Sequence, residues 1–149
     1  MSEHRAKIAW SLGEGDFTYE TYPRNHAWDF PGGPTIHASA APEYFGAPEN
    51  VDPEQAFVAA CSSCHMLTFL AIAARKRLRV ERYEDDAVGF LEKTEDGKFA
   101  VTRVELRPEI AWGGEKIPDA DTVAKIHEKA HENCFIANTV KSEIVVMGE

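Results

Sequence analysis

The residues of this chain best suited to chemistry are three cysteines and one histidine. Cys61, Cys64 and His65 fall inside a single apolar stretch, Ala56–Ala74, and Cys134 lies near the C-terminal end of the chain. A buried thiol can be an inert packing residue, so the cysteines alone establish little. Their setting matters more, because the stretch is too apolar for a surface helix and yet carries polar atoms at its centre. This combination indicates a chemical site.

Two short motifs include the first pair of thiols. The segment Cys61-Ser-Ser-Cys64-His65 fits the C-x-x-C-H pattern of covalent haem attachment and also the redox C-x-x-C pattern. Haem attachment normally requires export, and neither an export signal nor a distal ligand is evident. A redox C-x-x-C normally opens a helix, where the macrodipole lowers the thiol pKa, whereas both thiols here lie well inside the predicted helix. Both interpretations are therefore disfavoured.

A third motif, His127-Glu128-Lys-Ala-His131, satisfies H-E-x-x-H on a predicted helix. Residues i and i+4 share a helix face, so both imidazoles could bind zinc, with Glu128 as general base. No third ligand follows at a recognised spacing. We therefore expect these histidines to lie on a charged helix without a metal, and a zinc-dependent hydrolase is the alternative function.

Length and composition limit the class of protein. A chain of 149 residues with 44% hydrophobic residues predicts one globular domain over residues 1–149. A net charge of −9 argues against nucleic acid as a partner, because phosphate binding needs clustered Lys and Arg. The N-terminal segment lacks the apolar region of a secretory signal. Three cysteines without such a signal indicate the reducing cytoplasm.

Hydrophobic periodicity and turn residues predict the α+β class. A long helix is expected over 52–77, where Asp52 is the N-cap, Pro53 is at N1 and Gln55 is at N3. A second helix is expected over 119–133. The remaining elements are short strands over 7–10, 17–22, 26–30 and 35–39, a loop over 41–50, long strands over 79–93 and 98–112 joined by a turn at 95–97, and a closing strand over 140–147.

The long helix could be mistaken for a membrane span. Ala56–Ala74 contains no charged residue and approaches the length that crosses a bilayer. Its central polar side chains, among them Ser62, Ser63 and Thr68, would be costly in lipid, so we expect a central helix covered on every side and no membrane partner. A domain of this size has difficulty wrapping one helix completely. The uncovered face is therefore expected to meet the same helix of a second copy, which predicts a homodimer.

Two longer segments carry a family resemblance. The segment Pro53-Glu-Gln-Ala-Phe-Val-Ala-Ala-Cys-Ser-Ser-Cys64 resembles the central-helix signature of the OsmC/Ohr family, in which a Pro-Glu pair precedes a cysteine ten residues after the Glu. The segment Ala130-His-Glu-Asn-Cys134-Phe-Ile-Ala-Asn138 resembles the second cysteine segment of the same family. The predicted order of strands and helices also agrees, so the resemblance covers most of the chain.

The resemblance implies an OsmC-like fold, with antiparallel sheets packed around a long central helix and an intertwined homodimer. It implies a thiol-dependent peroxidase that acts on organic hydroperoxides without a metal or cofactor, and a dithiol reductant of the lipoyl type. Cys64 takes the peroxidatic position and Cys134 the resolving position. Cys61 has no expected counterpart in the family, so we expect it to be a packing residue. A non-catalytic OsmC-like stress protein remains a further alternative.

The chemistry of a buried thiol agrees with these roles. Burial raises a thiol pKa, so a cation must stabilise the Cys64 thiolate. The resemblance implies an arginine from the N-terminal β region, held by the glutamate at the helix start. Arg24 and Glu54 are the candidates, and Arg5 is the second choice for the arginine. His65 points about 100° away from Cys64 around the helix and is expected to be structural.

The implied reaction has two steps. The Cys64 thiolate attacks the distal oxygen of the peroxide, releases an alcohol and becomes a sulfenic acid. Cys134 then condenses with the sulfenic acid to a disulfide, which the dithiol reduces. Phe57, Leu67 and Phe135 are the predicted substrate-binding residues.

Overall fold

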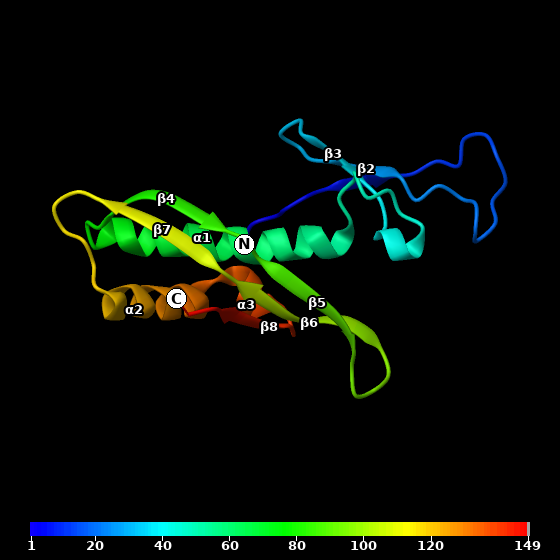
Figure 1. Ribbon diagram of the computed structural model, residues 1–149. Helices are drawn as coiled ribbons and strands as arrows, with labels where there is room; N and C mark the ends of the chain where they lie inside the picture. The colour runs from blue at the N-terminus through cyan, green and yellow to red at the C-terminus, as the bar shows by residue number, and fades with distance from the viewer. Residues whose placement is uncertain (149) are drawn as a thin grey trace. The chain divides into compact units, whose positions relative to one another are not determined.

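The computed structural model describes residues 1–148, which form two compact units, Met1–Ala56 and a second that begins at Phe57. It confirms the predicted α+β class, with three sheets and one long helix (Figure 1). In chain order the elements are β1 (Lys7–Ala9), β2 (His26–Asp29), β3 (Thr35–Ala38), η1 (Pro42–Tyr44), α1 (Pro53–Arg75), β4 (Arg79–Asp85), β5 (Val88–Lys93), β6 (Phe99–Leu106), β7 (Pro108–Gly113), α2 (Ala120–Asn133), α3 (Phe135–Thr139) and β8 (Glu143–Val146).

The first unit contains a three-stranded antiparallel sheet in the order β1-β2-β3. The strand predicted over 17–22 is wrong. The amides of Thr21 and Tyr22 both donate to the carbonyl of Thr18, so this segment turns on itself and does not extend. Aromatic residues favour a strand, but two of those in this segment, Tyr19 and Tyr22, pack against the guanidinium of Arg24. The predicted loop over 41–50 also contains the short helix η1.

Helix α1 begins as the sequence predicts. The amide of Gln55 donates to Asp52 Oδ1 at 2.8 Å, and the amide of Asp52 donates to Gln55 Oε1 at 3.0 Å. These reciprocal bonds form a capping box, and Pro53 occupies the first helical position. The helix ends at Arg75 because Arg77 adopts a left-handed φ of 59°, which turns the chain so that the amide of Leu78 donates to the carbonyl of Ala73.

The two long strands predicted after α1 are each broken in two. Strand β4 pairs with β7 and β5 pairs with β6, both antiparallel, with the turn near Gly97 as predicted. Strand β8 pairs with β6 in parallel, which departs from the predicted all-antiparallel pairing. The chain crosses over through α2 and α3 before β8, and a crossover of this length is what a parallel pairing requires.

Helices α1 and α2 pack together through one stripe of each. Buried residues of α1 recur every four positions, and those of α2 do the same up to its C-terminal cap: Cys61, His65, Phe69 and Ala73 on α1, and Ile126, Ala130 and Cys134 on α2. Residues from both stripes share a buried core cluster with Leu78. Within this single chain α1 is therefore covered along one stripe only, and Leu67 on another face is 61% exposed.

By length and composition α1 could cross a membrane. It has 23 residues, and an 18-residue window within it has a mean hydropathy of 1.8. Its buried stripe packs against α2 and against strand residues such as Val80, Ile110 and Trp112. This packing is that of the core helix of a folded domain, in which an apolar helix passes the same test of length and hydropathy.

Candidate active site

The three thiols differ in their access to solvent. All three cysteines are free, and Cys61 and Cys134 are buried, with exposed fractions of 1% and 2%. Cys64 is half-buried on α1, one helical turn beyond Cys61. A peroxide that approaches from solvent can therefore reach Cys64 before either of the other two thiols.

Cys134 lies where α2 ends and α3 begins. It is the C-cap of α2 and the N-cap of α3, a short helix that was not predicted from the sequence. Its Sγ accepts a hydrogen bond from the amide of Ala137 at 3.4 Å. Burial raises the pKa of Cys134 against the opposing effect of that amide, and the neighbouring Cys64 thiol raises it further. The structure thus brings Cys64 and Cys134 together.

Cys61 packs in the core, as predicted. It belongs to a buried cluster with Val104 and Leu106, to which Phe57 and Ile136 also contribute. Burial, followed by the nearby sulfurs of Cys134 and Cys64, raises the pKa of Cys61 to about 11. Cys61 is therefore protonated at neutral pH and is a poor nucleophile, because the thiolate is the reactive form.

Arg24 is held tightly within the first unit. Its guanidinium donates to the carbonyl oxygens of Tyr22 and Tyr19, each at 2.6 Å, and its exposed fraction is 9%. The guanidinium carbon lies 3.5 Å from the centroid of the Tyr22 ring and 4.9 Å from that of Phe45. Such cation–π contacts and two backbone acceptors fix the orientation of the side chain.

Glu54, the predicted carboxylate partner of Arg24, lies half-buried in the first turn of α1. Within residues 1–148 no ion pair joins the two side chains. Arg5, the second choice, pairs instead with Glu3 at 2.7 Å on the surface. The roles predicted for Arg24 and Glu54 at the thiolate remain predictions.

The three residues predicted to bind substrate lie in different surroundings. Phe57 packs against the cluster that contains Cys61. Leu67 and Phe135 are 61% and 82% exposed, so neither is enclosed by this chain. Phe135 directly follows Cys134, which keeps it close to the paired thiols, and the substrate role of all three residues stays a prediction.

A pair of histidines joins α1 to α2 beside the thiols. His65 Nε2 and His127 Nδ1 are 3.0 Å apart, and the two ring planes differ by only 9°. His65 is 1% exposed, and Phe69 packs its ring 4.4 Å from that of His127. From the sequence, His65 is expected to be structural and His127 to be part of an H-E-x-x-H motif, and no local signal predicts that the two pair.

The histidine pair is neutral at pH 7. Burial, followed by the charges of His127 and His131, lowers the pKa of His65 to about 4, and burial also lowers the pKa of His127 although Asp85 opposes this. One ring must therefore donate its single N–H to the other. His65 Nδ1 is buried and has no hydrogen-bond partner. An unpaired acceptor costs less than an unpaired donor, which favours the tautomer in which His65 Nε2–H donates to His127 Nδ1.

This pair predicts a loss of stability in mild acid. The folded-state pKa of His65 is lowered from 6.5 to about 4, so its contribution is complete above pH 6.5 and is lost as the pH falls toward 4. Between pH 7 and pH 5 we expect the free energy of unfolding to drop by about 2 kcal/mol, at roughly 1.4 kcal/mol per pH unit below 6.5. Urea unfolding at the two pH values measures the drop, and His65→Leu should remove most of it. An equal drop in the variant would contradict this assignment.

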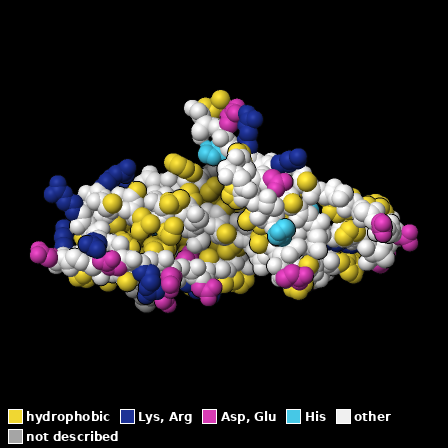
Figure 2. Space-filling model, turned by 90° about the horizontal axis from the view of Figure 1, so that it is seen from above, with side chains coloured by type: hydrophobic (Ala, Val, Ile, Leu, Met, Phe, Trp, Pro, Cys, Tyr) yellow, Lys and Arg dark blue, Asp and Glu magenta, His cyan; other side chains and the backbone are white. Residues whose placement is uncertain are grey.

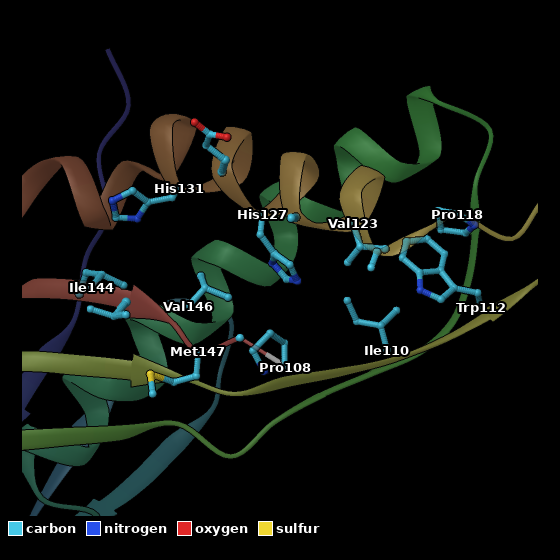
Figure 3. A pocket seen from close by; sticks show the side chains of 15 residues that line it. Pro108, Ile110, Trp112, Pro118, Val123, His127, His131, Ile144, Val146 and Met147 are labelled. Carbon is cyan, nitrogen blue, oxygen red and sulfur yellow. The ribbon is translucent and has the colours of Figure 1, made fainter.

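A cavity of about 710 Å³ lies between α2, β7 and β8 (Figure 3). Its walls are mostly apolar, with Ile110 and Trp112 from β7 and Val123 from α2. His127 points into it from α2, and His131 lies at one end. In the tautomer inferred above, His127 presents an Nε2–H donor to this apolar space. No sequence signal marked the cavity, because its residues come from three separate elements.

The H-E-x-x-H motif does not gather a third ligand. His127 is engaged with His65, and His131 is exposed on α2. Over residues 1–148, no group of three or more His, Cys, Asp or Glu side chains is arranged to hold a metal ion. The described side chains therefore offer no support for the zinc-hydrolase alternative.

A three-sheet α+β fold, whose long helix sets one cysteine beside a second at a helix end, defines an OsmC-like protein. The family model described as OsmC-like protein matches residues 46–147, so this chain belongs to the OsmC-like family. The predicted resemblance and fold are thereby confirmed.

Individual relatives agree with this assignment. A solved OsmC-like protein of unknown function from Vibrio cholerae is 49% identical, with a TM-score of 0.96 and 99% of each chain covered. An organic hydroperoxide resistance protein OsmC from Legionella pneumophila shares the fold at 19% identity, with a TM-score of 0.71 over 97% of this chain and 93% of that one. An uncharacterized protein of Bacillus subtilis, YmaD, is 23% identical over 81% of each chain.

Proposed function

We propose that this protein is a thiol-dependent peroxidase that reduces organic hydroperoxides. The Cys64 thiolate attacks the distal peroxide oxygen, the O–O bond breaks, and the alkoxide leaves as an alcohol after it takes up a proton. The resulting Cys64 sulfenic acid reacts with the Cys134 thiol to form a disulfide and water. An external dithiol, of the lipoyl type implied by the family resemblance, then returns both thiols.

One observation carries this proposal: the most accessible thiol, Cys64, has the buried thiol of Cys134 as its neighbour. The peroxidatic step needs a sulfur that substrate can reach, and the resolving step needs a second sulfur in contact with it. Membership of a family in which relatives are named organic hydroperoxide resistance proteins supports the same chemistry. Arg24 and Glu54 are the proposed cation and carboxylate that stabilise the thiolate in the cytoplasmic protein.

The test compares thiols and metal in the same purified sample. One equivalent of cumene hydroperoxide should remove two free thiols per chain rapidly, and metal analysis should find no stoichiometric zinc. Unreactive thiols together with one zinc per chain would favour the hydrolase alternative. Unreactive thiols without zinc would favour a non-catalytic OsmC-like protein.

We also propose that the protein is an intertwined homodimer. Hydrophobic side chains are exposed on the surface (Figure 2), and in the second unit they include Leu67 on α1 and Phe135 beside Cys134. An apolar helix that its own chain covers along one stripe is stabilised when a second copy covers the rest. Light scattering at micromolar concentration should therefore give twice the mass of one 16.6 kDa chain. A mass of one chain would contradict the dimer.

A further inference from the structure

The contact between α1 and α2 contains one directional interaction. The helices run in opposite directions (Figure 1), so Cys64 lies near Cys134 while Phe69 lies near His127. Most of the shared core is aliphatic or aromatic. Among the described residues, the His65–His127 bond is the only side-chain hydrogen bond between these two helices.

Apolar packing alone leaves the helix register weakly specified. Hydrophobic burial is non-directional, and apart from Phe69 the buried residues that face each other, Ala73, Ala130 and Ile126, are small or aliphatic. A slide of one helical turn, about 5.4 Å, would exchange one apolar contact for a similar one. The histidine pair penalises that slide, because the buried imidazole of His65 would lose its hydrogen-bond partner away from water.

The thiols tolerate no such slide. A disulfide requires a Cα–Cα separation of about 4.4–6.8 Å, so a displacement of one turn would put the two sulfurs out of bonding range. His65 directly follows Cys64 on α1, and His127 precedes Cys134 on α2. The two histidines therefore lie on the same two helices as the thiols. Their hydrogen bond limits how far α1 can slide along α2.

We propose that His65 and His127 are positioning residues for the disulfide step: their hydrogen bond sets the register of α1 against α2 that places Cys64 opposite Cys134. This role rests on the proposed function for its biological purpose. The geometry itself can be measured without peroxide. In a glutathione buffer the two protein thiols and one oxidised glutathione exchange to give the Cys64–Cys134 disulfide and two reduced glutathiones, and the equilibrium reports the effective molarity of the thiol pair.

The experiment measures that effective molarity in the wild type and in four variants. His65→Leu and His127→Leu remove the hydrogen bond and keep an apolar side chain, so each should lower the effective molarity at least about tenfold. His65→Gln retains a donor and should recover part of the loss. Lys129→Gln, an exposed change on the same helix α2, should match the wild type. Peptide mapping separates the Cys64–Cys134 bond from any bond to Cys61.

The outcomes separate register from general stability. A purely structural histidine would change urea stability and leave the effective molarity of the folded variant unchanged, and that result in either leucine variant would overturn the inference. His127 is only half-buried, so His127→Leu provides a folded variant if His65→Leu does not fold. A wild type that forms the disulfide in glutathione but ignores cumene hydroperoxide would contradict the proposed function and leave this inference standing.

Discussion

Replacing Cys64 by serine is expected to lower the turnover of cumene hydroperoxide by at least about 1000-fold, because a serine hydroxyl stays protonated and cannot accept the peroxide oxygen. Cys64 is half-buried, whereas the other two sulfurs are almost fully enclosed, so no other thiol can take over the first step. Peroxide consumption coupled to a dithiol measures the loss, and circular dichroism checks that the isosteric change leaves the fold intact.

Cys61→Ser is the matched control. It removes a sulfur from the same helix, one turn away, and retains the Cys64–Cys134 pair. The pKa of about 11 keeps the Cys61 thiol protonated at neutral pH, so its removal should leave most of the activity. If the folded Cys61→Ser variant were as inactive as Cys64→Ser, Cys64 could not be the only thiol that the peroxidatic step requires.

Replacing Cys134 by serine should separate the two steps of the reaction. The first equivalent of hydroperoxide should still oxidise Cys64, but the sulfenic acid then lacks its proposed resolving thiol, Cys134. One thiol per chain should disappear where the wild type loses two, and dimedone should trap Cys64. Excess hydroperoxide should convert Cys64 to sulfinic acid and lower sustained turnover by roughly 100-fold.

Cys61 provides the check on this second prediction. The sulfurs of Cys134 and Cys64 lie close enough to Cys61 to raise its pKa, so Cys61 is the one thiol that could replace Cys134. Loss of two thiols in Cys134→Ser, with a Cys61–Cys64 bond in the peptide map, would contradict the assignment of Cys134 as sole resolving residue. Combining Cys134→Ser with Cys61→Ser should then restore the one-thiol result.

Local sequence signals predicted the elements that carry the thiols. The capping residues Asp52 and Gln55 placed the start of α1 correctly, because the bonds that form a capping box involve residues close in sequence. Asp119 likewise caps α2 at the predicted place. The family motifs around Cys64 and Cys134 led to the correct fold, since they span the helix and the second cysteine segment.

Tertiary contacts determined what the sequence could not predict. His65 and His127 are 62 residues apart, and nothing local marks them as partners. The prediction of a strand over 17–22 was wrong because Tyr22 in this segment packs against the guanidinium of Arg24 and does not join a sheet. Helix α3 was missed because it is a single short turn, initiated by Cys134 in the role of N-cap, a position for which cysteine is not a typical residue.

Peptide mapping of the protein after one equivalent of organic hydroperoxide tests the central claim most directly. We expect one intramolecular disulfide joining Cys64 to Cys134, formed together with one equivalent of alcohol and absent from the untreated protein. Recovery of both thiols unmodified, or oxidation confined to Cys61, would contradict it.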